Sequence, residues 1–122
     1  MKRYKREEPL RYEFARPLDV SFYISRLRGE SYQSSRGKGV IHNISPGGLR
    51  LETSLKLHEV EDVEITFEIE IGTFSIQPTG TIVWKEIKGA NYIYGIEYTS
   101  EDYGNDIIRA LKEYPKAPKK KK

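Results

Sequence analysis

The stretch EDVEITFEIEIG, residues 61–72, decides the fold of this 122-residue chain, because its apolar and polar side chains alternate strictly from Val63 to Ile71. A period of two places successive side chains on opposite faces of a β-strand, whereas a helix brings every third or fourth residue to one face. The apolar set is Val63, Ile65, Phe67, Ile69 and Ile71, and the polar set is Glu64, Thr66, Glu68 and Glu70. The alternation predicts a strand with one buried face, and it assigns the acidic side chains to solvent rather than to catalysis.

Five further segments have strand patterns, and turn-forming residues separate them. They are DVSFYI (19–24), GVIHNI (39–44), GLRLET (48–53), FSIQPTGTIVWKE (74–86) and NYIYGIEYT (91–99). We expect the fourth to bend near Pro78 and Gly80, because proline lacks a ladder donor and glycine tolerates a kink. Together the six segments predict an all-β fold, namely a small six-stranded antiparallel barrel.

The period changes to that of a helix in SEDYGNDIIRALKEY, residues 100–114. Ser100 is the expected N-cap, acidic residues follow it in the first turn, and Pro115 ends the segment. The apolar side chains at helical spacing are Tyr103, Ile107, Leu111 and Tyr114. The sequence therefore predicts a C-terminal helix that caps the barrel.

The length fits one domain with a single core. Residues 1–17 have mixed charge, two prolines and no clean period, which indicates an extended N-terminal arm. Residues 18–114 are expected to hold the barrel and its helix. Residues 115–122, PKAPKKKK, contain five lysines and no acid, which is typical of a disordered basic tail.

The net charge of +3 depends on this tail. Taking its five lysines from the 21 basic residues leaves 16 against 18 acidic residues, a net of −2 for the rest of the chain. Such a body lacks the broad basic surface of a DNA-binding domain, so no DNA partner is expected. A single-stranded nucleic-acid interface, with bases stacked on Trp84, Tyr92 or Tyr94, is a further hypothesis, and the same acidity argues against it.

Several functional classes lack the residues they need. The chain has no cysteine, which excludes disulfides, thiolate metal sites and cysteine nucleophiles. His42 and His58 form no metal-binding pair of known spacing, and neither GxSxG nor a phosphate-binding P-loop occurs. No signal peptide and no apolar run of roughly 20 residues are present. We expect a cytoplasmic protein that is not an enzyme and has no metal or integral membrane segment.

Residues suited to binding a ligand gather in two places. HNISPGG (42–48) puts the short polar side chains of Asn43 and Ser45 at a strand end, and Gly47 and Gly48 allow positive φ and a close approach to the backbone. The basic residues of the arm can clamp phosphates and bond the Hoogsteen edge of guanine. These are Arg3, Lys5, Arg6 and Arg11. The two places together predict a site for an anionic purine nucleotide, although ordinary turn chemistry also accounts for Asn43 and Ser45.

The combination of an arginine-bearing arm with Asn43-Ile-Ser45-Pro-Gly-Gly48 resembles the PilZ domain family, bacterial receptors for the second messenger cyclic di-GMP. That family combines R-x-x-x-R in an N-terminal loop with D/N-x-S-x-x-G on a six-stranded barrel. GTIVW (80–84) and YGIEY (94–98) are similar to its later strands, and a C-terminal helix is often present there too. The resemblance covers nearly the whole chain and implies that cyclic di-GMP is the ligand.

The resemblance implies five ligand-binding residues: Arg6, Arg11, Asn43, Ser45 and Gly48. The last three match the second motif in full, and Arg11 matches the second arginine of the first motif. The first motif is degenerate, because Glu7 stands four residues before Arg11, where the family has arginine. Arg6 lies one residue earlier, and slack in the arm would let it reach the ligand.

Two functions follow from this resemblance. In the first, the arm closes over cyclic di-GMP and the domain signals to a separate effector protein that controls motility or biofilm formation. The alternative is a degenerate PilZ-fold protein-interaction module that does not bind the nucleotide. Glu7 favours the alternative, and the intact second motif favours the receptor.

Overall fold

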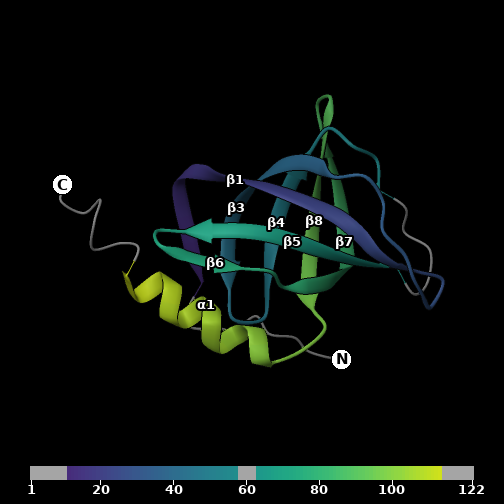
Figure 1. Cartoon of the computed structure of the whole chain (residues 1–122). Coiled ribbons are helices and arrows are strands. Elements are labelled where there is room, and N and C mark those ends of the chain that lie inside the picture. Colours follow the sequence, from purple (N-terminus) through teal and green to yellow (C-terminus); the bar gives the residue numbers. More distant parts are fainter. Residues whose placement is uncertain (1–10, 58–62, 114–122) are drawn as a thin grey trace.

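The structure, a computed structural model, describes residues 11–57 and 63–113, so the expectations for Arg6, Glu7, His58, Tyr114 and the basic tail lie outside it. Eight strands precede one helix (Figure 1). The elements are β1 (Tyr12–Leu27), β2 (Glu30–Ser31), β3 (Gly37–Ser45), β4 (Gly48–Thr53), β5 (Glu64–Ile71), β6 (Phe74–Ile76), β7 (Thr79–Lys88), β8 (Asn91–Tyr98) and α1 (Asp102–Glu113).

The six longer strands form a closed antiparallel ring. They follow one another in the order β1-β3-β4-β8-β7-β5, and pairing of β5 with β1 closes the circuit. The short strands β2 and β6 are attached to β1 and β5. The predicted all-β fold with six main strands and a C-terminal helix is confirmed, and the two short strands are additions that the sequence did not reveal.

The core fills the interior of the ring, and β5 shows how the alternation builds it. Ile65, Phe67, Ile69 and Ile71 are all buried, as predicted. The prediction for Thr66 was wrong, because this side chain is buried as well. Its hydroxyl lies 2.8 Å from Ser25 Oγ and 2.7 Å from Thr79 Oγ1. The flanking strands β1 and β7 thus cover Thr66 and supply hydrogen-bond partners for its hydroxyl. A buried polar group with such partners is not destabilising.

One strand begins earlier than expected, and one segment divides at the position where a bend was expected. β1 begins at Tyr12 rather than near residue 19, and its register against β3 shifts between Glu13 and Leu18. Residues 12–17 of the segment assigned to the arm are therefore part of the sheet. The segment 74–86 divides at Pro78 into β6 and β7, which confirms the expected bend. The carbonyl of Pro78 accepts a hydrogen bond of 2.9 Å from the Phe67 amide.

Helix α1 lies across the end of the ring at which the turn between β3 and β4 points (Figure 1). Ser100 Oγ accepts a hydrogen bond from the Asp102 amide at 3.1 Å, in agreement with its predicted capping role. Ile107 and Ala110 are fully buried against the core. A Cβ on Gly104 would lie 3.1 Å from the Pro46 carbonyl oxygen, so the helix packs closely on the β3–β4 turn.

Candidate functional site

A lateral row of residues crosses five neighbouring strands of the ring. Glu13 on β1 is opposite Asn43 on β3, Asn43 is opposite Arg50 on β4, and Arg50 is opposite Gly95 on β8. Gly95 is in turn opposite Trp84 on β7. Because residues in register lie on the same face of a sheet, residues far apart in the sequence form one continuous surface.

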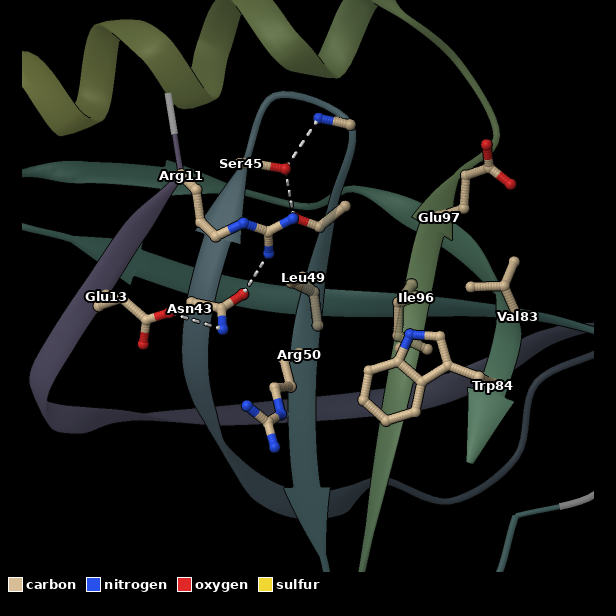
Figure 2. Close-up of a pocket in the computed structure, with 13 residues that line it drawn as sticks. Arg11, Glu13, Asn43, Ser45, Leu49, Arg50, Val83, Trp84, Ile96 and Glu97 are labelled. Carbon is tan, nitrogen blue, oxygen red and sulfur yellow. Dashed lines mark hydrogen bonds between the residues drawn. The ribbon is translucent and has the colours of Figure 1, made fainter. Parts of the chain in front are cut away.

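This row forms the floor of a cavity of about 610 Å³ (Figure 2). Asn43 of the second motif belongs to the row, and Ser45 and Gly48 of the same motif line the cavity beside it. The volume is within the roughly 300–1,000 Å³ typical of small-molecule sites. Of the five residues that the resemblance implied, the four described ones line this cavity: Arg11, Asn43, Ser45 and Gly48. Arg6 is outside the described residues.

A chain of hydrogen bonds fixes the side chain of Asn43, of which only 3% is exposed. Arg11 Nη1 donates to Asn43 Oδ1 at 3.1 Å, and Asn43 Nδ2 donates to Glu13 Oε2 at 3.3 Å (Figure 2). Asn43 therefore bonds across strands instead of forming the Asx-turn considered from the sequence. Through this chain the start of β1 and the arginine before it are tied to β3, with the Arg11 side chain directed into the cavity.

Ser45 stabilises the turn that follows it. The Gly47 amide donates to Ser45 Oγ at 3.3 Å, and Ser45 Oγ donates to the Gly48 carbonyl at 3.3 Å. The Tyr98 amide bonds the Gly47 carbonyl at 3.0 Å, which anchors the turn to the end of β8. Turn chemistry is thus present at Ser45, and the same residue also borders the cavity.

Gly48 is required by the sheet itself. A Cβ at this position would collide with the Ile96 carbonyl oxygen of the neighbouring strand β8. The expectation of a positive φ is not met, because the described glycines with positive φ are Gly29, Gly72 and Gly89. The glycine of the second motif thus permits close strand pairing, and its missing side chain also leaves the cavity floor open.

The sequence did not reveal the other half of the site. Trp84 was named only as a base-stacking residue in the single-stranded nucleic-acid hypothesis, yet it is 44% exposed at the cavity. Tyr94, considered with it, is fully buried in the core. Arg50, Glu13 and Glu97 also line the cavity and were not proposed. What places these residues together is the register of the strands. β-Bulges at Ile41/Asn43 and Ile82/Trp84 shift this register by one residue.

Charges of both signs surround the cavity. The guanidinium groups of Arg11 and Arg50 are accompanied by the carboxylates of Glu13 and Glu97. Guanidinium groups suit phosphates, and carboxylates suit the N–H groups on the Watson–Crick edge of guanine. This mixture is compatible with a ligand that carries both phosphate and guanine.

A second charged cluster lies two residues further along β4, around Glu52. His42 Nε2 lies 2.6 Å from Glu52 Oε1, and Asn91 Nδ2 donates to Glu52 Oε2 at 2.7 Å. These hydrogen bonds, first that of His42, and the nearby Lys88 ammonium hold the pKa of the Glu52 carboxyl below its usual value. Through these contacts His42, Glu52, Lys88 and Asn91 link β3, β4, β7 and β8 next to the site.

Metal and membrane features can be checked for residues 11–57 and 63–113. Within these ranges no three His, Cys, Asp or Glu side chains are gathered so as to hold a metal ion. A helix with the length and apolar character of a membrane span is also absent from them.

Three solved structures are similar to this fold. The PilZ domain of CeSA from a cellulose-synthesizing bacterium aligns with a TM-score of 0.54 and 13% identity, over 80% of this chain and 92% of that one. MrkH of K. pneumonia in its apo state gives 0.63 and 15%, over 99% and 55%. The PilZ domain of YcgR from Escherichia coli, solved with c-di-GMP, gives 0.57 and 14%, over 95% and 99%. At these identities the likeness concerns the fold.

The family model described as PilZ domain matches residues 3–114. The chain therefore belongs to the PilZ domain family, whose members are known as receptors for cyclic di-GMP. PilZ domains are binding or receptor domains rather than enzymes. Among curated proteins, none matches this chain.

Proposed function

We propose that this PilZ domain is a cytoplasmic, non-enzymatic receptor that binds cyclic di-GMP in the cavity above the Asn43–Arg50–Trp84 row. The observation that carries the proposal is the convergence of Arg11, Asn43, Ser45 and Gly48 on one cavity of suitable volume. These residues come from separate segments, and turn formation alone gives no reason for Arg11 to lie there. Membership of a cyclic di-GMP receptor family supports the same conclusion.

In the proposed complex, the sheet and the arm have different roles. Asn43 and Ser45 are held by the sheet and present directional polar groups. The indole of Trp84 offers a rigid aromatic surface for stacking a guanine base, an interaction worth about 1–3 kcal/mol per base in nucleotide-binding proteins. Arg11 closes the other side, and Arg6 on the arm adds a cation. Closure of the arm changes the surface beside the ring, and an effector protein that controls motility or biofilm formation responds to that change.

Calorimetric titration with cyclic di-GMP tests this proposal. We expect saturable binding by the wild-type chain and a loss of roughly tenfold to a hundredfold for Arg11→Ala and Asn43→Ala, which is the range for removing a hydrogen bond to a charged group. Arg109→Ala, on the exposed face of α1, serves as the matched control and should bind as the wild type does. No heat up to high micromolar ligand would reject the receptor function.

A degenerate interaction module is the second candidate, and specific residues favour it. Glu7 replaces the first motif arginine. Glu13 and Glu97 add carboxylates to the cavity lining, and these would repel phosphates that lie close to them. Under this hypothesis the domain acts on its effector without nucleotide. The same titration distinguishes the two candidates, and Glu7→Arg should tighten binding only if the domain is a receptor.

A further inference from the structure

The side chain of Arg50 occupies the centre of the cavity floor with hydrogen-bonding capacity to spare. Its Nε is buried and donates no hydrogen bond to any of the described residues. Its Nη2 is 3.9 Å from Glu86 Oε1, at the limit of an ion pair, and 38% of the side chain is exposed. The long ion pair holds the exposed end of the guanidinium only weakly, so a ligand anion at the cavity can bind it.

Two other arginines, Arg26 on β1 and Arg36 just before β3, have carboxylate partners closer than that of Arg50. Arg36 Nη2 lies 2.7 Å from Glu68 Oε2, and Arg36 Nε is bonded to the same carboxylate at 3.0 Å. Arg26 lies 3.5 Å from Glu64 and donates to the Gly29 carbonyl at 2.7 Å. Arg50 thus differs from Arg36 and Arg26 in having a weakly held guanidinium at a cavity.

We propose that Arg50 is the second phosphate-binding guanidinium of the site and compensates for the arginine that the arm lacks at Glu7. This inference rests on the proposed binding of cyclic di-GMP. The ligand carries two phosphates, and the described part of the cavity lining contains two arginines, Arg11 and Arg50. One phosphate is bound by Arg11, and the other accepts hydrogen bonds from the Nη groups of Arg50, at the end of a side chain that is 38% exposed.

The geometry places Arg50 between the two other elements that recognise the ligand. It is opposite Asn43 across β3 and β4, and its guanidinium carbon lies 5.9 Å from the centre of the Trp84 ring. Figure 2 shows Arg11 reaching toward Asn43, whereas the guanidinium of Arg50 lies on the other side of Asn43 and points away from it. A phosphate at Arg50 would therefore be next to a base stacked on Trp84 and next to the amide of Asn43.

The position of Arg50 on a strand also has an energetic consequence. An arginine on an arm loses conformational freedom when the arm closes, and that loss opposes binding. Arg50 is carried by β4, which is hydrogen-bonded on both edges to β3 and β8, so its backbone is already ordered. A cation supplied by the sheet replaces one supplied by the arm at a smaller entropic cost.

Calorimetry on the full chain with cyclic di-GMP tests the role of Arg50. Arg50→Gln keeps a polar side chain, although a shorter one, and removes its charge, and we expect binding at least tenfold weaker. Arg50→Lys should be intermediate, because lysine keeps the charge but cannot bind a phosphate with a planar fork. Added salt should weaken the wild type more than Arg50→Gln, since an ionic contact is lost. Arg109→Gln is the control.

A variant that leaves Arg50 intact provides an independent test. Glu86→Gln removes the carboxylate that competes for the guanidinium, and we expect it to tighten binding several-fold. Wild-type binding with Arg50→Gln and Glu86→Gln both unchanged would overturn the role of Arg50 and leave the receptor function standing. Absence of binding by the wild type itself would overturn the receptor function and this inference together.

Discussion

The indole of Trp84 lies over Gly95, in the space that any other residue would fill with its Cβ. A Cβ on Gly95 would collide with Nε1 and Cε2 of the indole. Gly95 pairs with Trp84 on one side and with Arg50 on the other. The missing side chain therefore allows an aromatic ring on β7 to reach across β8 toward a guanidinium on β4, and it joins the two halves of the cavity.

Gly95→Ala should displace this ring with little harm to the fold. The colliding atoms belong to a half-exposed side chain that can rotate away, so we expect a loss of stability of about 1 kcal/mol, at the lower end of the range for overpacked sites. Trp84 is the only tryptophan of the chain, so its fluorescence spectrum reports the displacement directly. Affinity for cyclic di-GMP should fall together with the spectral change. An unchanged spectrum would contradict the placement of the indole.

Gly48→Ala should be far more harmful to stability, although it adds the same methyl group. Here the collision is with the Ile96 carbonyl of the β8 backbone, which cannot move without opening the β4–β8 pairing. We expect a loss at the upper end of the roughly 1–3 kcal/mol typical of overpacked sites, with occasional larger values. Urea denaturation of the two alanine variants side by side measures the contrast. Equal losses would argue against a structural requirement for Gly48.

Asn43→Asp tests why asparagine rather than aspartate occupies this motif position. Aspartate would keep the bond from Arg11, but it would place a second carboxylate beside Glu13, where Asn43 Nδ2 now donates at 3.3 Å. We expect Asn43→Asp to be destabilising and Glu13→Gln to restore most of the loss, with a coupling energy of about 0.5–3 kcal/mol. A double-mutant cycle by chemical denaturation gives this value, and additive effects would show that the two side chains do not interact.

The dependence of stability on pH should contain a contribution from Glu52. Its lowered pKa means that the folded chain binds this proton less tightly than the unfolded chain, whose carboxyl titrates near 4.3. The stabilisation is therefore fully present above that value and is lost as the pH falls through the lowered pKa.

Glu52→Gln should consequently lower stability at pH 7 and reduce the loss that the wild type shows in acid. Thermal unfolding between pH 7 and about pH 3 measures both effects. Glu101→Gln, at an exposed position before α1, is a suitable control. If the variant and the wild type lose stability in parallel as the pH falls, Glu52 is not responsible.

The sequence revealed those parts of the fold that depend on local alternation. The six segments with strand patterns and the helical spacing in residues 100–114 were sufficient to predict the ring and its helix. Thr66 was expected to be exposed together with the glutamates of its face, but a strand enclosed by β1 and β7 can bury a hydroxyl that finds partners. The start of β1 was missed because Arg11 to Pro17 has no clean period, and its pairing with β3 depends on tertiary contacts.

The candidate site was only half accessible to sequence reasoning. Asn43, Ser45 and Gly48 are close together in the chain, so a motif can contain them. Arg50, Gly95 and Trp84 meet only through the registers of β4, β8 and β7, and the bulge at Ile82/Trp84 decides which side chain of β7 lies beside Arg50. A shift of one residue there would put a different side chain in the row, and no local pattern specifies it.

The close packing of Gly104 against Pro46 connects the C-terminal helix to the turn beside the cavity. The turn that carries Ser45 rests on the first turns of α1, and the Tyr98 amide holds Gly47 from the same side. We expect a ligand that displaced this turn to shift α1 as well, because Gly104 packs closely against Pro46. Ligand binding would then be detectable as a movement of α1, which contributes no residue to the cavity lining.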